Sequence, residues 1–461
     1  MKTAVILAAG EGSRAWPYCG IRQKVTLPVV NVPMVRRLTL DLMAEGIDRI
    51  VAVVGHRAEA VRACLGDIGC VRFVDQGVPK GPVDAALAGL GAVEDSEVLV
   101  CCGDIVTSRC TLGRIVRGFS ERHSAALLLT AETPPGLTSS SIAVQVGADG
   151  TVLGIWARGG SEHPRFAGIA AAQTELLRRY LLRDPGMMLG VGVGDMPPPE
   201  GNLAYPFELM RKDGIEVHAV QAQDFLVDVD KPWHVLEANA KAARHAIDAL
   251  DGIVLDKGAA IDDGADIPGD ARAALGPGAR IGKGCHIDGS LIVGPNTQIV
   301  NGAILGAGSI LGADVRCEDY CHVGEGSVLG DHSIVSHCAE FRGVTFERVY
   351  LYHYCCVTGL VGRNVDIGAA TVCGTWRFDD GVKTQNIAGH RELPECFGSA
   401  TYLGDFCRTG VNAIFMPGVK IGYYSCVGGG AIVYDDVPER TMVLPKQELV
   451  HKPWGPEKLG W

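Results

Sequence analysis

A six-residue period in the second half of the chain limits its fold more than any other feature of the sequence. From Leu275 to Val335 every sixth residue is aliphatic or cysteine, and glycine directly follows seven of these eleven positions. Neither an α-helix nor a hairpin repeats every six residues, whereas each face of a parallel β-helix does. The aliphatic residue then points into the coil, and small residues allow the chain to turn each corner. The positions are Leu275, Ile281, Ile287, Val293, Ile299, Leu305, Leu311, Cys317, Val323, Leu329 and Val335.

Interruptions of this repeat set the expected domain boundaries. The phase shifts after Val335, and hexads return at Val361 and again, after a gap, from Leu403 to Val433. Residues 344–358 and 376–402 interrupt the coils, and loops that long in a compact repeat are usually functional or cover a neighbour. We expect a helical linker at 232–250, the β-helix at 251–438, and a tail at 439–461 that is free to pack on another subunit.

The first half of the chain, residues 1–231, has a different pattern. Apolar runs typical of buried parallel strands alternate with amphipathic segments typical of helices. The runs lie at Thr3–Ala8, 50–54, 71–74 and 98–102, and the first two helical segments lie at 34–45 and Ala58–Leu65. This alternation predicts an α/β, doubly wound (Rossmann-like) domain that binds its ligands at the carboxyl ends of the strands.

A glycine-rich segment directly after the first strand is the sharpest motif of this half. Successive backbone N–H groups in such a turn form a nest for phosphate oxygens, and Arg14 can neutralise the charge that develops on a leaving pyrophosphate. The segment is not a Walker sequence, and it lacks the GxGxxG spacing of dinucleotide folds. It consists of Leu7, Ala8, Ala9, Gly10, Glu11, Gly12, Ser13 and Arg14.

Charge and composition exclude several classes of protein. A net charge of −11 argues against nucleic acid or an anionic membrane as the main partner. The apolar start of the chain is too short for a signal peptide, and no run approaches the length of a membrane span. The cysteines lack the facing CxxC pairs of zinc sites. They are expected to be mostly small buried hydrophobes in a cytoplasmic protein.

The residues after the glycine-rich segment carry a resemblance to a known family. Lys24 stands in the run QKVTLPV, which is followed by NVPMV. With the preceding segment, this resembles the sugar-phosphate nucleotidyltransferases, which open with LAAGxGTR and PKxLLPVxxKPM. The resemblance implies a nucleoside triphosphate and a sugar 1-phosphate as substrates, with Arg14 and Lys24 binding the triphosphate and its pyrophosphate leaving group. Gln76 and Gly81 lie where the family reads the base, although Pro79 and Pro82 replace its Gln and Thr.

Two aspartates are the candidate metal ligands. Asp104 follows the strand at 98–102, where the family holds Mg²⁺ between the phosphates. Asp228 begins the run DVDKPW, which is similar to the D-x-G-x-P-W pattern of archaeal-type relatives. Asp230 replaces the glycine of that pattern and is either a surplus acid or an additional ligand. Two carboxylates together with phosphate oxygens suit Mg²⁺, which prefers oxygen ligands.

The whole architecture resembles the bifunctional N-acetylglucosamine-1-phosphate uridyltransferases/glucosamine-1-phosphate acetyltransferases, particularly the archaeal-type branch. The resemblance implies a left-handed β-helix, a homotrimer formed through it, and acetyl-CoA as a further substrate. His353 falls near the family's catalytic His, and Glu340 and Arg342 fall near its Glu and Lys. Cys356 stands near an expected Tyr, and the spacing from Glu340 to His353 is one residue short. A trimerising or regulatory β-helix is therefore the alternative to acetyl transfer.

The sugar pocket departs from the family pattern. Ala157 stands where the family has Glu, and Phe166 stands where it has Asn. Losing both polar groups removes hydrogen bonds to an N-acetylated sugar, so a different sugar or cyclitol phosphate is expected.

The expected activity is Mg²⁺-dependent nucleotidyl transfer from UTP or dTTP to a sugar 1-phosphate. The alternatives are a bifunctional enzyme that also N-acetylates an amino-sugar phosphate, a monofunctional acyltransferase, and a degenerate scaffold or regulatory protein. The charged set of Arg14, Lys24, Asp104 and Asp228 favours catalysis, because a dead site has no reason to keep it.

Overall fold

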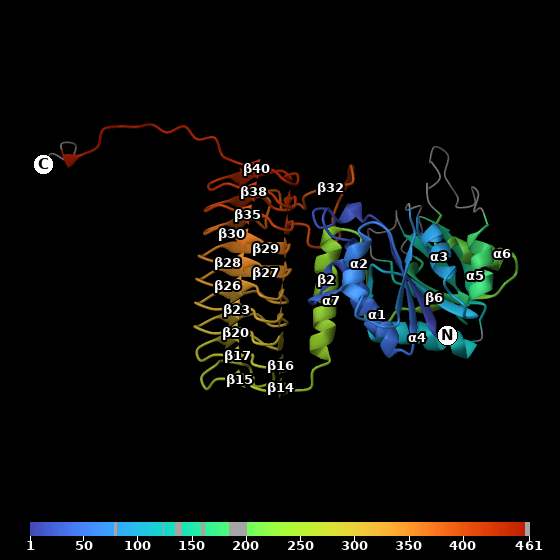
Figure 1. Cartoon of the computed structure of the whole chain (residues 1–461). Helices are drawn as coiled ribbons and strands as arrows, with labels where there is room; N and C mark the ends of the chain where they lie inside the picture. The colour runs from blue at the N-terminus through green and yellow to red at the C-terminus, as the bar shows by residue number, and fades with distance from the viewer. Residues whose placement is uncertain (78–80, 123, 134–140, 158–161, 184–200, 457–461) are drawn as a thin grey trace.

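The computed structural model describes residues 1–77, 81–122, 124–133, 141–157, 162–183 and 201–456. An α/β domain stands beside a stack of short coils, and helix α7 (Pro232–Asp248) runs along the junction between them (Figure 1). Both predicted fold classes are confirmed: a Rossmann-like domain is followed by a left-handed parallel β-helix. Among the described residues, no helix combines the length and the apolar character that a membrane span requires.

The sheet of the first domain has a parallel core in the order β5-β4-β1-β6, continued by β11, β8 and β12. Strand β11 runs antiparallel to β6, so the sheet is mixed. The strands are β1 (Thr3–Ala8), β4 (Arg49–Val54), β5 (Val71–Asp75), β6 (Glu97–Cys102), β8 (Ala126–Ala131), β9 (Ile142–Val146), β10 (Val152–Ala157), β11 (Arg165–Gln173) and β12 (Val217–Gln221). The helices are α1 (Met34–Ala44), α2 (Ala58–Leu65), α3 (Pro82–Leu90), α4 (Arg109–Arg122), α5 (Thr174–Leu181) and α6 (Tyr205–Lys212). Apolar clusters on both faces make this a doubly wound core.

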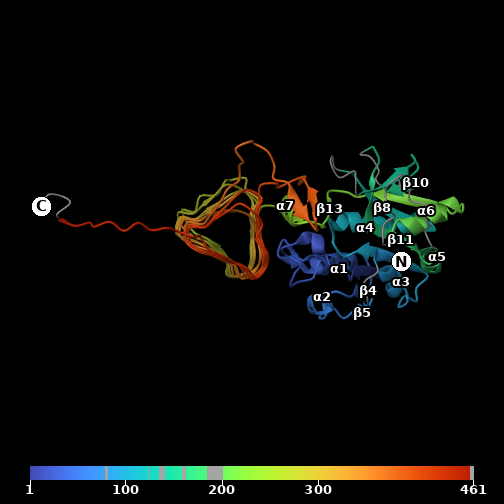
Figure 2. The ribbon, with the colours of Figure 1, turned by 90° about the horizontal axis from the view of Figure 1, so that it is seen from above.

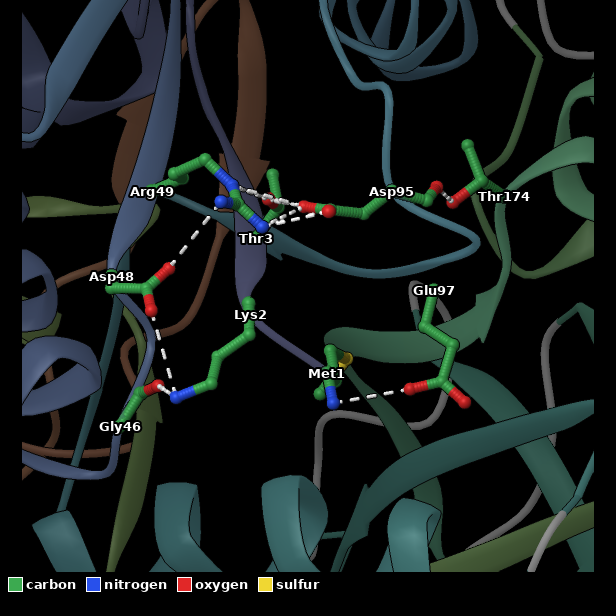
Figure 3. Close-up of polar contacts among 9 residues, drawn as sticks. All are labelled: Met1, Lys2, Thr3, Gly46, Asp48, Arg49, Asp95, Glu97 and Thr174. Atoms are coloured by element: carbon green, nitrogen blue, oxygen red, sulfur yellow. Dashed lines mark hydrogen bonds and ion pairs between the residues drawn. The ribbon is translucent and has the colours of Figure 1, made fainter.

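Polar contacts tie together the amino ends of the central strands (Figure 3). Arg49, which opens β4, places Nη2 2.7 Å from Oδ1 of Asp95, just before β6. Thr3 of β1 donates to the same carboxylate. Hydrogen bonds from Thr3 and Arg49 lower the pKa of Asp95 below its ordinary value. This edge is closed by its own side chains, which leaves the opposite, carboxyl edge of the sheet for a site.

The β-helix has a triangular cross-section, and its coils stack in register (Figure 2). Leu275 pairs with Val293, Val293 with Leu311, and the next strand down places Leu329 beside Leu311. Nearly all of the predicted hexad positions are fully buried in one continuous apolar core. The strands begin with β14 (Ile253–Leu255) and end with β40 (Met442–Val443), beyond the predicted end at residue 438.

The first predicted interruption, at 344–358, is wrong. Strands β27 (Glu340–Thr345), β28 (Tyr350–Leu351) and β29 (Cys356–Val361) continue the coils through it. Val335 pairs with Leu351, so this coil is two residues shorter than the coil before it, and the shortening shifts the register of the hexads. The shortened corner depends on Gly343, whose φ is 133° and whose added Cβ would lie 2.1 Å from the oxygen of Gly359. Gly343 therefore lets the chain turn this corner with fewer residues than the other corners use.

The second interruption, at 376–402, is an insertion that covers a neighbour, as expected. It carries a hairpin of β32 (Gln385–Ile387) and β33 (His390–Glu392), which lies beside the amino end of α7 (Figures 1 and 2). Glu395, just after the hairpin, accepts a hydrogen bond of 2.7 Å from Nε1 of Trp233 and lies 3.7 Å from Nε2 of His234. Lys231 pairs with Glu392. The insertion thus fixes the start of α7.

A column of outward-facing apolar side chains joins the two domains. Strand neighbours of the inward residues must face outward, and on one face of the β-helix these neighbours are also apolar. They are buried against α7 and against the segment around Tyr18, whose hydroxyl donates to the carbonyl of Leu360 at 2.6 Å. The column consists of Ile310 (β22, Ile310–Leu311), Val328 (β25, Val328–Leu329), Val344, Leu360 and Tyr402 (β34, Thr401–Leu403).

A buried ion pair crosses the same interface. Nε of Arg22 lies 2.7 Å from Oδ2 of Asp405, a fully buried carboxylate of the β-helix. The guanidinium also stacks over the ring of Phe346. Oδ1 of Asp405 accepts from the backbone N–H of Arg363 at 2.9 Å, so both carboxylate oxygens are bound.

Removing the buried carboxylate should weaken the junction. Asp405→Ala leaves buried Arg22 with only Glu347, 3.7 Å away, as a counter-charge among the described residues, so we expect the free energy of unfolding to fall by about 3 kcal/mol. Urea unfolding followed by circular dichroism measures the change. As a matched control, Asp67→Ala breaks the exposed pair with Arg36 and should leave the midpoint almost unchanged. Equal midpoints for the two variants would contradict this account.

Acid should release the contact of the insertion with α7. Burial alone would raise the pKa of Glu395, but hydrogen bonds from His234 and Trp233 and the charge of Lys231 lower it to about 2. A carboxyl whose pKa is depressed on folding stabilises the fold above its ordinary pKa, and this stabilisation is lost as the pH falls toward 2. Thermal unfolding of Glu395→Gln should therefore differ from wild type clearly at pH 6 and less at pH 3. A difference that grows on acidification would refute the prediction.

Candidate functional site

Two aspartates meet at the carboxyl edge of the sheet because a short ribbon joins their segments. Strand β7 (Ile105–Thr107), just after β6, pairs antiparallel with β13 (Leu226–Asp228). Ile105 lies opposite Asp228, and the backbone N–H of Val229 donates to the carbonyl of Asp104 at 3.0 Å. The ribbon therefore places Asp104 and Asp228 side by side, although they lie far apart in the sequence.

Two cations complete this cluster. Nζ of Lys24 lies 2.6 Å from Oδ2 of Asp104 and 3.7 Å from Oδ1 of Asp230. Nη2 of Arg14 lies 2.9 Å from the same Oδ1 of Asp230. Burial would lower the pKa of Lys24, but the charges of Asp104, Asp230 and Asp228 outweigh it and raise this pKa. Lys24 is therefore a permanent cation at this site. The structure brings together Arg14, Lys24, Asp104 and Asp228, and it adds Asp230 as the residue that links the two cations.

The aspartates are suited to a divalent cation. Burial and the neighbouring charge of Asp104 raise the pKa of Asp228, so a positive charge between the two carboxylates would relieve their repulsion. Within the described ranges, no group of three or more His, Cys, Asp or Glu side chains gathers into a complete metal cage. Mg²⁺ needs only one or two carboxylates when substrate phosphates supply its other ligands, so the pair fits it.

The glycine-rich segment is held in place by Gln23, which stands where the family's PKxLLPV pattern has Pro. Gln23 is buried, and its Nε2 donates to the carbonyls of Ala8 at 3.0 Å and Gly10 at 2.7 Å. Its Oε1 accepts from the N–H of Val25 at 2.7 Å. Gln23 thus clamps the loop to the turn that carries Lys24.

Close backbone contacts fix the conformation of the other residues of the glycine-rich segment. The carbonyl of Leu7, near the end of β1, accepts from the backbone N–H of Gly103, and the carbonyl of Ala9 accepts from the backbone N–H of His56. Gly12 has a φ of 67°, and an added Cβ would lie 2.6 Å from Cβ of Lys24. A larger residue at 12 would therefore displace the lysine. Ser13 opens the 3₁₀ turn Ser13–Ala15 that carries Arg14.

The predicted base-reading residues lie together before α3. Nε2 of Gln76 donates to the carbonyl of Gly81 at 3.2 Å, and Gly81 caps the helix with a φ of 98°. Pro82 follows as the first residue of α3. Pro79 lies outside the described residues.

A cavity of about 900 Å³ opens from the charged cluster. Arg14, Asp228 and Asp230 line one part of it, and Lys231, His234, Glu237 and Lys241 from the start of α7 line another. Strands β8, β9 and β11 supply a third wall, which includes Arg165 and Phe166. Because the insertion of the β-helix holds Lys231 and His234, the second domain supports one side of this cavity.

On the sugar side, the structure shows where the departures lie. Phe166 lines the cavity and also packs into the apolar core, so it presents a hydrophobic surface where the resemblance places an amide. Ala157 ends β10. The cavity residues that were not predicted from the sequence include Arg165, which immediately precedes Phe166, and Lys231, which lies in the DVDKPW run.

The predicted acyl-transfer residues do not line one site together. Glu340 and Arg342 share a cavity of about 330 Å³ on one face of the β-helix with His322. His353 lies at a corner instead, where its Nδ1 is 2.9 Å from Nδ1 of His337. It is not among the described residues that line this cavity.

Known proteins are similar to the chain over both domains. The bifunctional protein GlmU of Methanococcus maripaludis strain C5 is 25% identical over 450 residues, which cover 97% of this chain and 98% of the relative. The bifunctional protein GlmU of Methanocaldococcus jannaschii is 24% identical over 463 residues, with 97% and 99% covered. That of Symbiobacterium thermophilum is 36% identical over 134 residues, 28% of this chain and 27% of the relative.

Solved structures resemble the first half. The UTP-bound UGPase from Acinetobacter baumannii has a TM-score of 0.44 and 18% identity, covering 53% of this chain and 94% of its own. A UDP-glucose pyrophosphorylase complexed with UDP-glucose has a TM-score of 0.45 and 16% identity, covering 53% and 99%. The family described as "MobA-like NTP transferase domain" matches residues 4–252. The chain therefore belongs to the MobA-like NTP transferase family, as the sequence motifs predicted, and carries its nucleotidyltransferase domain on a β-helix.

Proposed function

We propose that the first domain transfers a nucleotidyl group from UTP or dTTP to a sugar 1-phosphate, releasing pyrophosphate and forming a nucleoside diphosphate sugar. The observation that carries this proposal is the charged cluster at the carboxyl edge of the sheet. Arg14 and Lys24 meet Asp104, Asp228 and Asp230 there, directly beside the glycine-rich loop and a cavity large enough for both substrates.

The residues have complementary roles in this proposal. The loop around Gly10 and Gly12 presents backbone N–H groups to the triphosphate. Arg14 and Lys24 hold the β- and γ-phosphates and neutralise the charge that grows on pyrophosphate as it leaves. Asp104 and Asp228 would hold Mg²⁺, which supplies charge neutralisation and orients phosphate oxygens when bound. The phosphate of the acceptor then attacks the α-phosphorus in line, so positioning rather than a covalent enzyme intermediate drives the reaction.

In the absence of substrate Lys24 and Arg14 are paired with aspartates, and substrate binding must break these ion pairs. In the structure the ammonium group of Lys24 binds Asp104, and Arg14 binds Asp230. Phosphates and a cation would replace these partners, because Lys24 and Arg14 would gain phosphates while Asp104 and Asp228 would gain the metal. Asp230 is therefore proposed as the residue that holds Arg14 ready in the free enzyme.

The acceptor is proposed to be a sugar or cyclitol phosphate other than plain N-acetylglucosamine 1-phosphate, because Phe166 gives the cavity an apolar surface. Acyl transfer at the β-helix receives no comparable support. His353 pairs with His337, whereas Glu340 and Arg342 line a separate cavity. For the β-helix we propose a supporting role toward the first domain and assembly into a homotrimer, as the family resemblance implies.

Loss of one phosphate-binding cation tests the proposal. Arg14→Ala should lower kcat/KM for pyrophosphate release by about 100-fold or more, because charge that develops in the transition state loses its partner. A coupled pyrophosphate assay with Mg²⁺, UTP or dTTP and a panel of sugar 1-phosphates measures the rate. Arg109→Ala, which breaks the ion pair between Arg109 at the start of α4 and Glu45 at the end of α1, is the matched control and should keep full activity. Near-normal turnover by Arg14→Ala would refute the assignment, and silence of the wild type across the panel would favour the scaffold alternative.

A further inference from the structure

The cations around the large cavity differ in one respect: whether the protein itself supplies their counter-charge. Arg14 pairs with Asp230, and Lys231 pairs with Glu392. Lys241 places Nζ 2.7 Å from Oε1 of Glu237. Arg165 is the exception among the cavity cations that the structure describes, since no described carboxylate lies within ion-pair distance of it.

Like Lys231, Arg165 is deeply buried. Its exposed fraction is only 7%, yet the side chain lines the cavity. Its Nε atom has no hydrogen-bond partner within the described part of the chain. Burial lowers the pKa of Arg165, and the more distant charges of Asp228 and Glu237 offset this only in part. A guanidinium nevertheless stays charged in a protein. The fold therefore holds a desolvated positive charge with a free donor at the cavity wall.

The local backbone explains how this arginine reaches the cavity. Arg165 opens β11 and lies opposite Ala131 of β8 and Ala143 of β9. The pairing of β11 with β8 loses register between Phe166 and Ala170. Such an irregularity re-aims side chains beside binding sites. The small side chains of the opposite alanines leave room beside the guanidinium.

A buried charge without a partner is costly, and the cost is recovered when a ligand brings an opposite charge. We infer that Arg165 binds a second anionic group on the acceptor, a carboxylate or a phosphate carried by the sugar in addition to its 1-phosphate. This inference rests on the proposed function. It makes acidic sugar 1-phosphates the preferred acceptor class of the enzyme.

The chemistry of the wall favours this group over a neutral hydroxyl. A guanidinium presents parallel N–H donors that match the two oxygens of a carboxylate or phosphate. Phe166, Ile142 and Ala131 are apolar neighbours in the same cavity wall, and low polarity strengthens an ion pair. In the proposed function Arg14 and Lys24 serve the triphosphate, and the 1-phosphate reacts beside the aspartates at that same wall, where the metal would neutralise its charge. Arg165 is thus left for a different anion.

Three matched acceptors test the inference: glucose 1-phosphate, glucuronic acid 1-phosphate and glucose 1,6-bisphosphate. Pyrophosphate release with Mg²⁺ and UTP or dTTP gives kcat/KM for each. We expect the wild type to prefer at least one acidic acceptor over glucose 1-phosphate by about tenfold or more, and the one preferred tells whether a carboxylate or a phosphate fits. Equal values for all three, or preference for the neutral sugar, would overturn the inference while leaving the proposed function standing.

Substitutions of Arg165 provide a second test of the inference. Arg165→Gln should abolish the preference, and Arg165→Lys should keep part of it, because the lysine retains the charge but loses the two-pronged geometry. Arg117→Gln, which removes an exposed partner of Glu45, is the matched control and should keep the wild-type ratio. Circular dichroism confirms that each variant folds. An equal loss of activity toward all three acceptors in Arg165→Gln, with the ratio unchanged, would show that Arg165 holds the 1-phosphate and would overturn the inference.

Binding separates failure of this inference from failure of the proposed function. If the wild type releases no pyrophosphate with any acceptor, the proposed function fails. Calorimetric titration with glucuronic acid 1-phosphate and with glucose 1,6-bisphosphate then decides the role of Arg165 alone. Binding of either compound to the wild type that falls at least tenfold in Arg165→Gln supports an anion site, and identical heats for the two proteins overturn it.

Discussion

The apolar column on one face of the β-helix is the constraint on which the rest of the structure depends. A hexapeptide coil buries its inward residues without help, but Val328, Leu360 and Tyr402 point outward and would be exposed on a free-standing coil. Helix α7 and the segment around Tyr18 cover them, and burial of such side chains contributes about 1.5–3 kcal/mol each. This contact fixes the two domains against each other. The buried ion pair of Arg22 and Asp405 adds an interaction of defined geometry to this otherwise apolar interface.

The consequence reaches the candidate site through α7. The helix begins directly after the run that carries Asp228 and Asp230, so whatever positions its first turn also positions those carboxylates. The insertion of the β-helix does this with Glu392 and Glu395. The β-helix is therefore a structural part of the nucleotidyltransferase site as well as a neighbouring domain. In this arrangement the β-helix positions residues of the candidate site without supplying a reactive group itself.

Charge balance is the second organising principle. Three aspartates and two cations pack at the carboxyl edge of the sheet, and each cation has a carboxylate partner before any substrate arrives. Such a cluster costs little to keep folded and can exchange internal partners for phosphates and a metal ion. Arg165 differs, because no carboxylate among the described residues lies within ion-pair distance of it and we infer that a ligand supplies its counter-charge. In the function proposed above, the paired cluster serves the nucleotide and Arg165 serves the acceptor.

The sequence by itself determined the two folds and the glycine-rich loop, and it singled out Arg14, Lys24, Asp104 and Asp228 as candidates, because each depends on a local period or on a motif at fixed spacing. It misread residues 344–358 as a loop, since a coil shortened at Gly343 looks like lost periodicity. Only the tertiary structure decided the roles of Gln23, Glu395 and Arg165. Their significance lies in what they face across the fold, and contacts between distant segments leave no period in a single sequence.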